Sequence, residues 1–307
     1  MYRLAHLSDI HLGPLPDVTY RDLASKRITG YLNWQRNRRR LLHPGVTDAL
    51  LDDIRAADVD HVAITGDLTN LALDAEIELA REWLELVGEP DHVSVVPGNH
   101  DAYVPGALAK ACRAWKPWMT GEKTRVGISE HGFPYLRVRD NVALIGISSA
   151  RATAPFMALG HFSATQARRV GKLLDIAAKR GLFRVIMIHH PPIRGATTAH
   201  KRLYGIGLFH KTLRRHGAEL VLHGHTHLPT LYWIEGPDGR IPVVGVTAAG
   251  QGMSGDKPPA QYNLFEIGGG PGAWTAMLRR KGLTGAALKL REVERVALYG
   301  ADHMAAI

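Results

Sequence analysis

The sequence lacks most features of secreted and membrane-embedded proteins. Cys112 is the only cysteine among 307 residues, so no internal disulfide can form and a reducing compartment suits the chain. No uninterrupted apolar run approaches the ~20 residues that span a bilayer, and the first residues do not resemble a signal peptide. Internal repeats and low-complexity segments are also missing. We therefore expect a soluble cytoplasmic protein, with peripheral contact at the inner membrane left open.

Acidic residues are the scarcer charge. The 38 Lys and Arg residues exceed the 29 Asp and Glu residues, which gives a formal net charge of +9. Such a balance favours anionic partners, namely phosphate esters, nucleic acid or an acidic membrane surface, without choosing among them. The length allows one large α/β domain or two smaller ones, and no break in composition separates two domains.

Short apolar, strand-like runs alternate with helical segments in the first two thirds of the chain. Residues 47–57 and 74–87 have helical patterns and precede the strand-like residues 61–65 and 92–96, which is typical of βαβ units. Ser163 to Gln166 resembles a capping box that opens a helix ending near Gly181. Beyond His227 the pattern becomes rich in strands and hairpins, and residues 283–307 are predicted to be weakly helical.

Polar side chains follow five of the strand-like runs. In an extended backbone, side chains two residues apart point the same way, so Asp9 and His11 are expected to face one point. A single Asp, Asn or His at a strand end is usually a cap or a turn residue. Five such segments together indicate one shared site. The segments are Asp9-Ile10-His11, Gly66-Asp67, Gly98-Asn99-His100-Asp101, His189-His190 and Gly224-His225-Thr226-His227.

The side chains in these segments are imidazoles, carboxylates and an amide, with no thiolate. This set suits borderline-to-hard divalent ions such as manganese, iron, zinc, cobalt or nickel, and excludes an iron-sulfur cluster or a Cys-based zinc site. Seven ligands are too many for one tetrahedral site and suit two ions that share a carboxylate. Two metals ~3.5–4 Å apart are the usual arrangement for in-line displacement at phosphorus.

The ordered motifs resemble those of the calcineurin-like metallophosphoesterases. That family's pattern of D-x-H, G-D, G-N-H-D/E, H and G-H-x-H occurs here complete and in order between residues 9 and 227. The resemblance implies an α/β fold, a four-layer αββα sandwich. Two mixed β-sheets are flanked by helices, and the metal site lies at the C-terminal ends of the strands. It also implies a metal-dependent phosphoric ester hydrolase, and the interpretation we favour is a phosphodiesterase.

The resemblance further implies a role for each motif residue. Two divalent ions (Mn, Fe or Zn) would be bound, and a hydroxide bridging them would attack phosphorus. Asp67 would bridge the two ions, and His189 is preferred over His190 as a ligand. His100 would sit near the leaving-group oxygen, with Asp101 orienting it. One metal would be held by Asp9, His11 and His227, and the other by Asn99, His189 and His225.

The expected organisation is a metallophosphoesterase domain over residues 1–280 followed by a tail over residues 281–307. Residues 17–43 form an insertion rich in Arg and Lys with interleaved aromatic and aliphatic residues. Its spacing predicts a basic amphipathic helix interrupted at Thr29-Gly30. A lid over the metal centre, a membrane-facing arm and a helix packed on the body are all compatible with this pattern.

The substrate is left open by the motifs, because loops around such a site select it. The candidate loops are residues 17–43, residues 194–204 and Gly250-Gln251-Gly252. The expected partner is an anionic phosphoester, and residues 17–43 could touch an acidic membrane, whereas nucleic acid is not expected. The alternatives are a UDP-2,3-diacylglucosamine-type lipid pyrophosphatase, a nuclease and an inactive scaffold. The oligomeric state is not predicted.

Overall fold

The computed structural model describes residues 1–36, 45–122, 132–254, 256–285 and 288–300. Two six-stranded sheets dominate this part of the chain. In the first sheet the order is β14 (Lys289–Tyr299), β13 (Thr275–Thr284), β12 (Gln261–Gly268), β1 (Tyr2–Leu7), β2 (His61–Ile64) and β3 (Val93–Val95). In the second it is β10 (Leu231–Glu235), β11 (Arg240–Gly245), β9 (Leu220–His223), β7 (Phe183–Met187), β5 (Val142–Gly146) and β4 (Tyr135–Arg139).

Both sheets are mixed, with parallel strands at the centre. β1, β2 and β3 are parallel, and β12, β13 and β14 continue that sheet in antiparallel pairs. β5, β7, β9 and β11 are parallel, and β4 and β10 are antiparallel edge strands. The carboxyl ends of the parallel strands therefore lie together at one end of each sheet.

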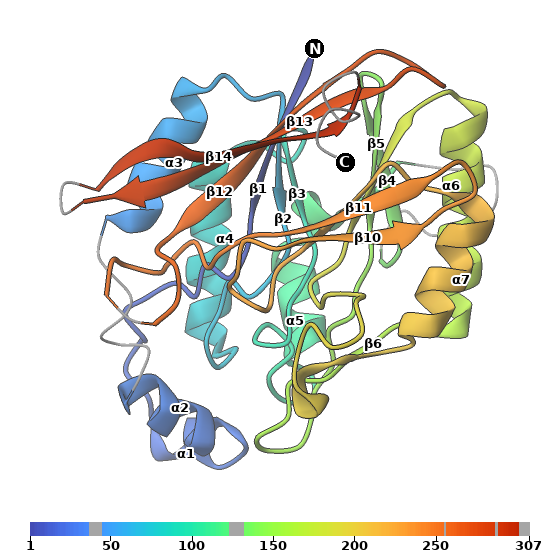
Figure 1. The fold of residues 1–307 in the computed structure, drawn as a ribbon. Coiled ribbons are helices and arrows are strands. Elements are labelled where there is room, and N and C mark those ends of the chain that lie inside the picture. The colour runs from blue at the N-terminus through green and yellow to red at the C-terminus, as the bar shows by residue number, and fades with distance from the viewer. Residues whose placement is uncertain (37–44, 123–131, 255, 286–287, 301–307) are drawn as a thin grey trace.

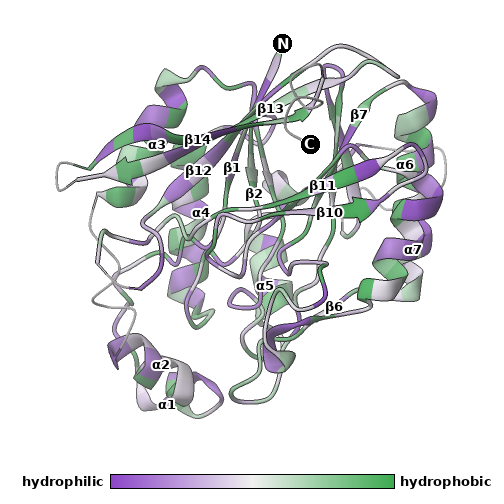
Figure 2. Ribbon diagram, viewed as in Figure 1, coloured by the Kyte–Doolittle hydropathy of each residue, from purple (hydrophilic) through white to green (hydrophobic). Residues whose placement is uncertain are grey.

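Helices cover the sheets, as Figure 1 shows with α3 and α4 on one side and α6 and α7 on the other. These helices carry hydrophobic and hydrophilic stripes (Figure 2), which places an apolar face toward the sheets. Their bounds are α3 (Val46–Ala56), α4 (Asp74–Val87), α5 (Ala107–Ala114), α6 (Ala164–Lys179) and α7 (Ile206–His216). The shorter elements are α1 (Tyr20–Leu23), α2 (Arg27–Arg36), η2 (Lys116–Met119), η3 (Ala199–Lys201), β6 (Gly160–His161) and β8 (Leu203–Tyr204).

Alternate residues of β5 and β7 enter different cores. Leu144 and Val185 pack in the core between the sheets together with residues of β1, α3 and α4. Ile145 and Ile186 point the opposite way and pack against α6 and α7. This two-residue period is that of strands buried on both faces. The expected arrangement of two mixed sheets flanked by helices is confirmed.

Most predicted elements are present, with their starts and ends close to expectation. The Ser163 side chain caps α6 by accepting the Gln166 amide hydrogen at 3.1 Å, and the helix ends just before Gly181. Among the described residues, no helix has both the length and the apolar content that crossing a bilayer requires.

Two predictions about the insertion and the tail are wrong. α2 runs through Thr29 and Gly30 without a break, and the interruption lies instead at residues 24–26. The described part of the tail is not helical, because β14 pairs with β13 from Thr284↔Lys289 to Ala276↔Tyr299. The expected division at residue 280 falls inside β13. Residues 37–43 of the insertion and 301–307 of the tail lie outside the described residues.

Candidate metal centre

Five loops at the strand ends carry the predicted ligands, and hydrogen bonds between main chains hold the loops together. The Asp9 amide donates to the Gly66 carbonyl at 2.9 Å, and the His11 amide donates to the Asp67 carbonyl at 3.0 Å. The Gly224 amide donates to the His189 carbonyl at 3.1 Å in the second sheet. The loops are thus fixed by backbone groups, which leaves the side chains available for the site.

The local backbone differs from the extended conformation expected after the first strand. Asp9 and His11 have φ angles of 53° and 47°, and Asp67, His225 and His227 have φ angles of 57°, 69° and 57°. Residues with a Cβ pay about 1–2 kcal/mol to enter this left-handed region. Five of the seven predicted ligands therefore share a costly conformation, which turns their side chains into the site.

Two motif glycines are required by close approach. A Cβ at Gly98 would lie 2.1 Å from Oδ1 of Asp67 and 2.5 Å from its amide nitrogen. A Cβ at Gly224 would lie 1.8 Å from Oγ of Ser8 and 2.5 Å from Oδ2 of Asp9. Any side chain at either position would push a carboxylate out of place.

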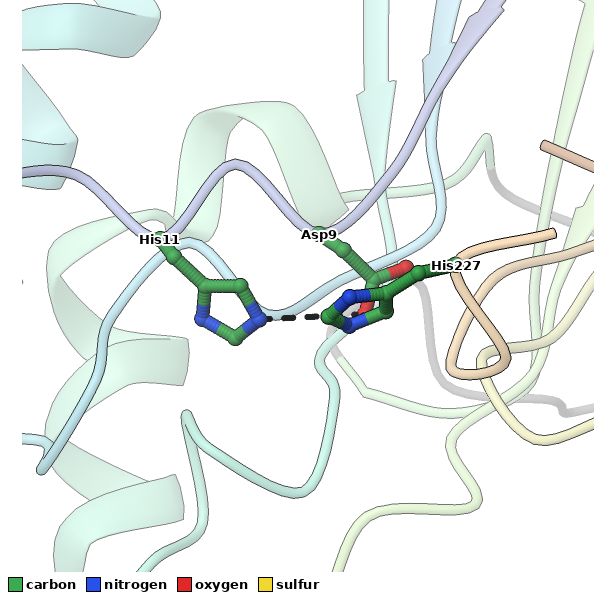
Figure 3. Close-up of side chains that lie close together, drawn as sticks. All are labelled: Asp9, His11 and His227. Carbon is green, nitrogen blue, oxygen red and sulfur yellow. Dashed lines mark ion pairs between the residues drawn. The ribbon is translucent and has the colours of Figure 1, made fainter. Parts of the chain in front are cut away.

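The ligand atoms form three overlapping groups, and within each group they lie within 4.8 Å of one another. Asp9, His11 and His227 make one group (Figure 3), with Nε2 of His227 3.0 Å from Oδ1 of Asp9. The other two groups share Asp67, and they are Asp67 with His189 and His225, and His11 with Asp67 and His100.

Each buried carboxylate uses its two oxygens differently. Oδ2 of Asp9 accepts the His225 amide hydrogen at 2.9 Å, while Oδ1 faces His227 and His11. Oδ1 of Asp67 accepts the His100 amide hydrogen at 2.7 Å, while Oδ2 lies 3.9 Å from Nε2 of His11 and 3.3 Å from Nε2 of His189. One oxygen of Asp67 thus faces both groups of imidazoles.

Backbone carbonyls select the tautomers of three imidazoles, because a carbonyl can only accept a hydrogen bond. Nδ1 of His11 donates to Thr69 at 3.0 Å, and Nδ1 of His189 donates to Thr65 at 2.6 Å. Nε2 of His225 donates to Lys201 at 2.9 Å. In the neutral ring the opposite nitrogen of each then carries a lone pair, as a metal ligand must.

Asn99 completes the ring of predicted ligands. It is 7% exposed, and its Oδ1 lies 3.2 Å from Nε2 of His189. The structure therefore brings all seven predicted ligands together.

The charges of the site also suit cations. Burial alone would raise the pKa of Asp67, but His189 and His100 hold it well below its usual range. Burial lowers the pKa of His189, yet the Asp67 carboxylate raises it to about 9. The carboxylates of Asp9 and Asp67 are both buried and ionised, and a buried anion needs compensating positive charge. Together with a nitrogen and oxygen donor set, this fits divalent ions.

His100 and Asp101 have different surroundings. Nδ1 of His100 donates to the Asn70 carbonyl at 2.6 Å, and its ring stacks on Tyr103 with centroids 5.4 Å apart. The Asp101 carboxylate instead accepts the amide hydrogens of Asp67, Leu68, Thr69 and Gly98 at 2.8–3.0 Å, together with the Thr69 hydroxyl. These contacts of Asp101 differ from the expected one, in which its carboxylate would orient the His100 ring.

The hydrogen bonds of His190 are made to groups outside the proposed ligand set. Nδ1 of His190 lies 2.8 Å from the Ser149 hydroxyl, and Nε2 lies 3.2 Å from the Ala158 carbonyl. Burial, together with neighbouring His189, lowers the pKa of His190 to about 3. The structure thus places His189 rather than His190 beside Asp67.

A cavity of about 420 Å³ opens over the ligands. Three lysines from distant segments line it, Lys26, Lys201 and Lys257. Gln251 of the predicted glycine-rich loop also lines it, whereas Arg194 and Arg202 of the predicted basic loop are not among its lining residues. Arg202 lies over the Tyr204 ring instead, 4.7 Å from its centroid.

Several groups at the site were not predicted from the sequence. Asn70 holds His100, Tyr103 stacks on it, and Phe156 and Lys257 line the cavity. Asn70 and Tyr103 each follow a recognised motif within three residues, so extending those motifs forward would have found them. Phe156 and Lys257 lie in loops without any pattern, and no signal in the sequence marks them.

Comparison with known proteins places the chain in a family. Residues 2–229 match the sequence profile of the calcineurin-like phosphoesterases, and the chain therefore belongs to this family of metallophosphoesterases. The fold resembles that of a dimetal phosphatase from Danio rerio, with a TM-score of 0.60 and 13% sequence identity over 98% of this chain and 99% of that one.

A second similar structure is a purple acid phosphatase from yellow lupin (Lupinus luteus) seeds. The TM-score is 0.55 and the sequence identity 10%, and the match covers 95% of this chain and 52% of that one. At such identities the likeness concerns the fold alone. Comparison with curated protein sequences gives no match.

Proposed function

We propose that this protein is a dinuclear-metal phosphodiesterase. The observation that carries the proposal is the position of Asp67, whose Oδ2 faces His11 on one side and His189 on the other. A carboxylate oxygen between two groups of imidazoles is the geometry that two ions sharing one ligand require. Asp9 and His227 complete the first group.

Seven residues would hold the two ions. Asp9, His11 and His227 would bind one, and Asn99, His189 and His225 the other, with Asp67 shared. When bound, two divalent ions such as Mn, Fe or Zn activate water for attack on phosphorus and neutralise the charge that develops there. The main-chain amides of His225 and His100 each hold one oxygen of Asp9 and Asp67, which leaves the other oxygen of each carboxylate directed into the site.

His100 would assist departure of the alcohol. Because Nδ1 donates to the Asn70 carbonyl, Nε2 is the nitrogen that exchanges a proton with the leaving oxygen. Stacking on Tyr103 keeps the ring in this orientation. Asp101 acts indirectly as a positioning residue, because its carboxylate holds the backbone of Asp67.

The cavity suits an anionic substrate. Lys26, Lys201 and Lys257 place positive charge around the ligands, and the net charge of +9 acts in the same direction. A diester keeps one negative charge after both of its alcohols are attached, and these cations would attract it.

A second candidate is hydrolysis of a lipid-linked pyrophosphate. The supporting observation is apolar exposure near the site, where Leu32 and Phe156 are 46% and 81% exposed. Leu32 belongs to α2, which also carries Arg27 and Arg36. In this case residues 17–43 would contact an acidic membrane surface.

Metal binding and a substrate panel test the proposal. We expect the manganese-loaded protein to contain two ions per chain by elemental analysis and to hydrolyse bis-p-nitrophenyl phosphate faster than p-nitrophenyl phosphate. Asp67→Asn should lower the metal content to one ion or fewer and reduce kcat by about 10³-fold or more. Asp175→Asn, which alters a surface pair with His216, is the matched control.

Three results would contradict or redirect the proposal. Wild-type protein without bound metal after repletion would overturn it, as would full activity of Asp67→Asn. Preference for UDP-diacylglucosamine over every simple diester would favour the lipid pyrophosphatase instead.

A further inference from the structure

A chain of four buried polar side chains lies behind the metal centre. Arg280 of β13, Asn263 of β12 and His6 of β1 are direct partners across three neighbouring strands, and the chain ends at Thr65, directly after β2. None of the four is more than 2% exposed. Buried polar groups that are all hydrogen-bonded fix one arrangement of a core. None of these residues has a role in the proposed reaction so far.

The guanidinium group sets the direction of every hydrogen bond in the chain, because arginine can only donate. Nη1 of Arg280 donates to Oδ1 of Asn263 at 3.1 Å, so Nδ2 of Asn263 donates to Nδ1 of His6 at 3.2 Å. Burial lowers the pKa of His6 well below its usual value, and the ring is therefore neutral. Since Nδ1 accepts, the proton is on Nε2, which donates to the Thr65 hydroxyl at 2.9 Å.

The two ends of the chain contact the second sheet. Arg280 donates to the carbonyls of Gly245 at 2.8 Å and Thr230 at 3.0 Å, at the start and end of the hairpin of β10 and β11. At the other end, the Thr65 carbonyl accepts from Nδ1 of His189 at 2.6 Å. The Thr65 hydroxyl is thus the last side-chain link between Arg280 and a proposed metal ligand.

The ligands of the other proposed ion rely on different contacts. Nδ1 of His11 donates to the Thr69 carbonyl, and the amide and hydroxyl of Thr69 donate to Asp101. The Asp67 amide also donates to Asp101, at 2.9 Å. Loss of the Thr65 hydroxyl leaves these contacts in place, so it should affect the two ions unequally.

We propose that His6 is a positioning residue that holds Thr65, and through it His189, in the orientation that binds one of the two ions. The inference rests on the proposed dinuclear centre. A ligand that is oriented before the ion arrives binds it at lower cost. Arg280 and Asn263 contribute by keeping the proton of His6 on the nitrogen that faces Thr65.

Two substitutions at Thr65 separate this role from simple packing. Thr65→Val keeps the shape and the carbonyl but lacks the hydroxyl, whereas Thr65→Ser keeps the hydroxyl and lacks the methyl group. Calorimetric titration of the metal-free protein with manganese gives both dissociation constants, and Asn99→Ala shows which one belongs to the ion at His189. We expect Thr65→Val to raise that constant about tenfold. Thr65→Ser should change it less than about twofold.

Ser94→Ala is the matched control. Nε2 of His61 lies 2.8 Å from the Ser94 hydroxyl, which repeats the pair of His6 and Thr65 between β2 and β3. Both control residues are as buried as that pair, and the Ser94 hydroxyl contacts Arg137 rather than a proposed ligand. This variant loses a comparable buried hydrogen bond, and both manganese constants should stay at their wild-type values.

The wild-type protein supplies a test that needs no variant. Nitrogen-15 NMR of the imidazole rings distinguishes the two tautomers, and we expect the proton of His6 on Nε2. A proton on Nδ1 would overturn the inferred direction of the chain and with it the role of His6.

The outcomes separate this inference from the proposed activity. Wild-type constants in Thr65→Val, or an equal loss in Thr65→Ser or Ser94→Ala, would overturn the role of His6 while diester hydrolysis could still stand. A tenfold loss confined to one ion in Thr65→Val, in a protein that hydrolyses no diester, would keep the role of His6 and remove the phosphodiesterase.

Discussion

At the scale of single residues, the site is built from side chains whose second polar atom is held by the main chain. Asp9 and Asp67 each give one oxygen to a backbone amide and direct the other into the site. His11 and His189 each donate from Nδ1 to a carbonyl. Such contacts fix orientation before any ion binds, and this lowers the cost of binding.

The role of His100 can be tested through the leaving group. We expect His100→Gln to reduce kcat by about 10²-fold for diesters of alkyl alcohols, because these alkoxides need a proton. The loss should be smaller for p-nitrophenyl esters, whose phenolate leaves without one. Metal content should not change. His200→Gln is a suitable control, since that exposed ring bonds to Thr198 and lies outside the cavity. Equal losses for both leaving groups would contradict the assigned role.

Lys26 should make substrate binding depend on pH. Burial lowers its pKa from the ordinary value to about 8, so the ammonium is present below pH 8 and is lost as the pH rises through that value. Loss of one positive charge beside the cavity should raise KM for bis-p-nitrophenyl phosphate by about fivefold between pH 7 and pH 9, an estimate for a partly exposed charge.

Two variants isolate this effect. Lys26→Arg should shift the rise in KM to higher pH, and Lys26→Met should show a high KM throughout. A wild-type KM that stays constant from pH 7 to pH 9 would show that Lys26 does not contribute to anion binding.

At the scale of elements, loops rather than strands carry the chemistry. Strand ends bring the loops together, but the loops keep their shape through contacts such as the Asp101 carboxylate. It accepts backbone hydrogens from the loops after both β2 and β3. Burial, and then neighbouring Asp67, raises the pKa of Asp101 to about 7. Its hydrogen bonds must therefore compensate for the cost of its buried position.

Removing this carboxylate should destabilise the protein. We expect Asp101→Ala to lower the free energy of unfolding of the metal-free protein by about 3–5 kcal/mol, because several buried amide hydrogens lose their acceptor. Urea denaturation measures this change. Asp52→Ala is the control, since its exposed pair with Arg55 should contribute less than about 0.5 kcal/mol. A similar loss in both variants would contradict the proposed role of Asp101.

At the scale of the whole molecule, the last described strand connects the two sheets. β14 pairs with β13 in the first sheet. The Tyr299 hydroxyl at its end donates to the Glu219 carbonyl at 2.9 Å, just before β9 in the second sheet. The Tyr299 ring also packs edge to face with Phe183 of β7. Residues beyond 280 therefore contribute to the same body as the metal centre.

A truncation tests this contribution. A chain ending at residue 280 would lose Leu283 and Leu298, which are 4% and 0% exposed. Their burial is worth about 2 kcal/mol each, so we expect at least about 4 kcal/mol of stability to be lost and the Tm to fall. An unchanged Tm for the shorter chain would show that residues 281–307 are a separate tail.

Local sequence was sufficient to predict much of this protein. Apolar runs predicted the central strands, and the capping residue Ser163 predicted α6, because both depend on neighbours in the chain. The seven expected ligands occur at the ends of parallel strands, and each sheet gathers the ends of its own parallel strands at one edge. The fold class and the gathering of these side chains were therefore predictable.

Other features depend on contacts between distant residues and had no local signal. Pairing with β13 overrides the weak helical pattern of the tail. An unpaired sheet edge and exposed apolar side chains would destabilise the protein more than helix formation in the tail could stabilise it. Asp101 bonds to the loop after β2 rather than to its neighbour His100. Lys26, Lys201 and Lys257 meet only because three loops fold over one cavity. These contacts form only when the chain packs, because the residues that make them lie far apart in the sequence.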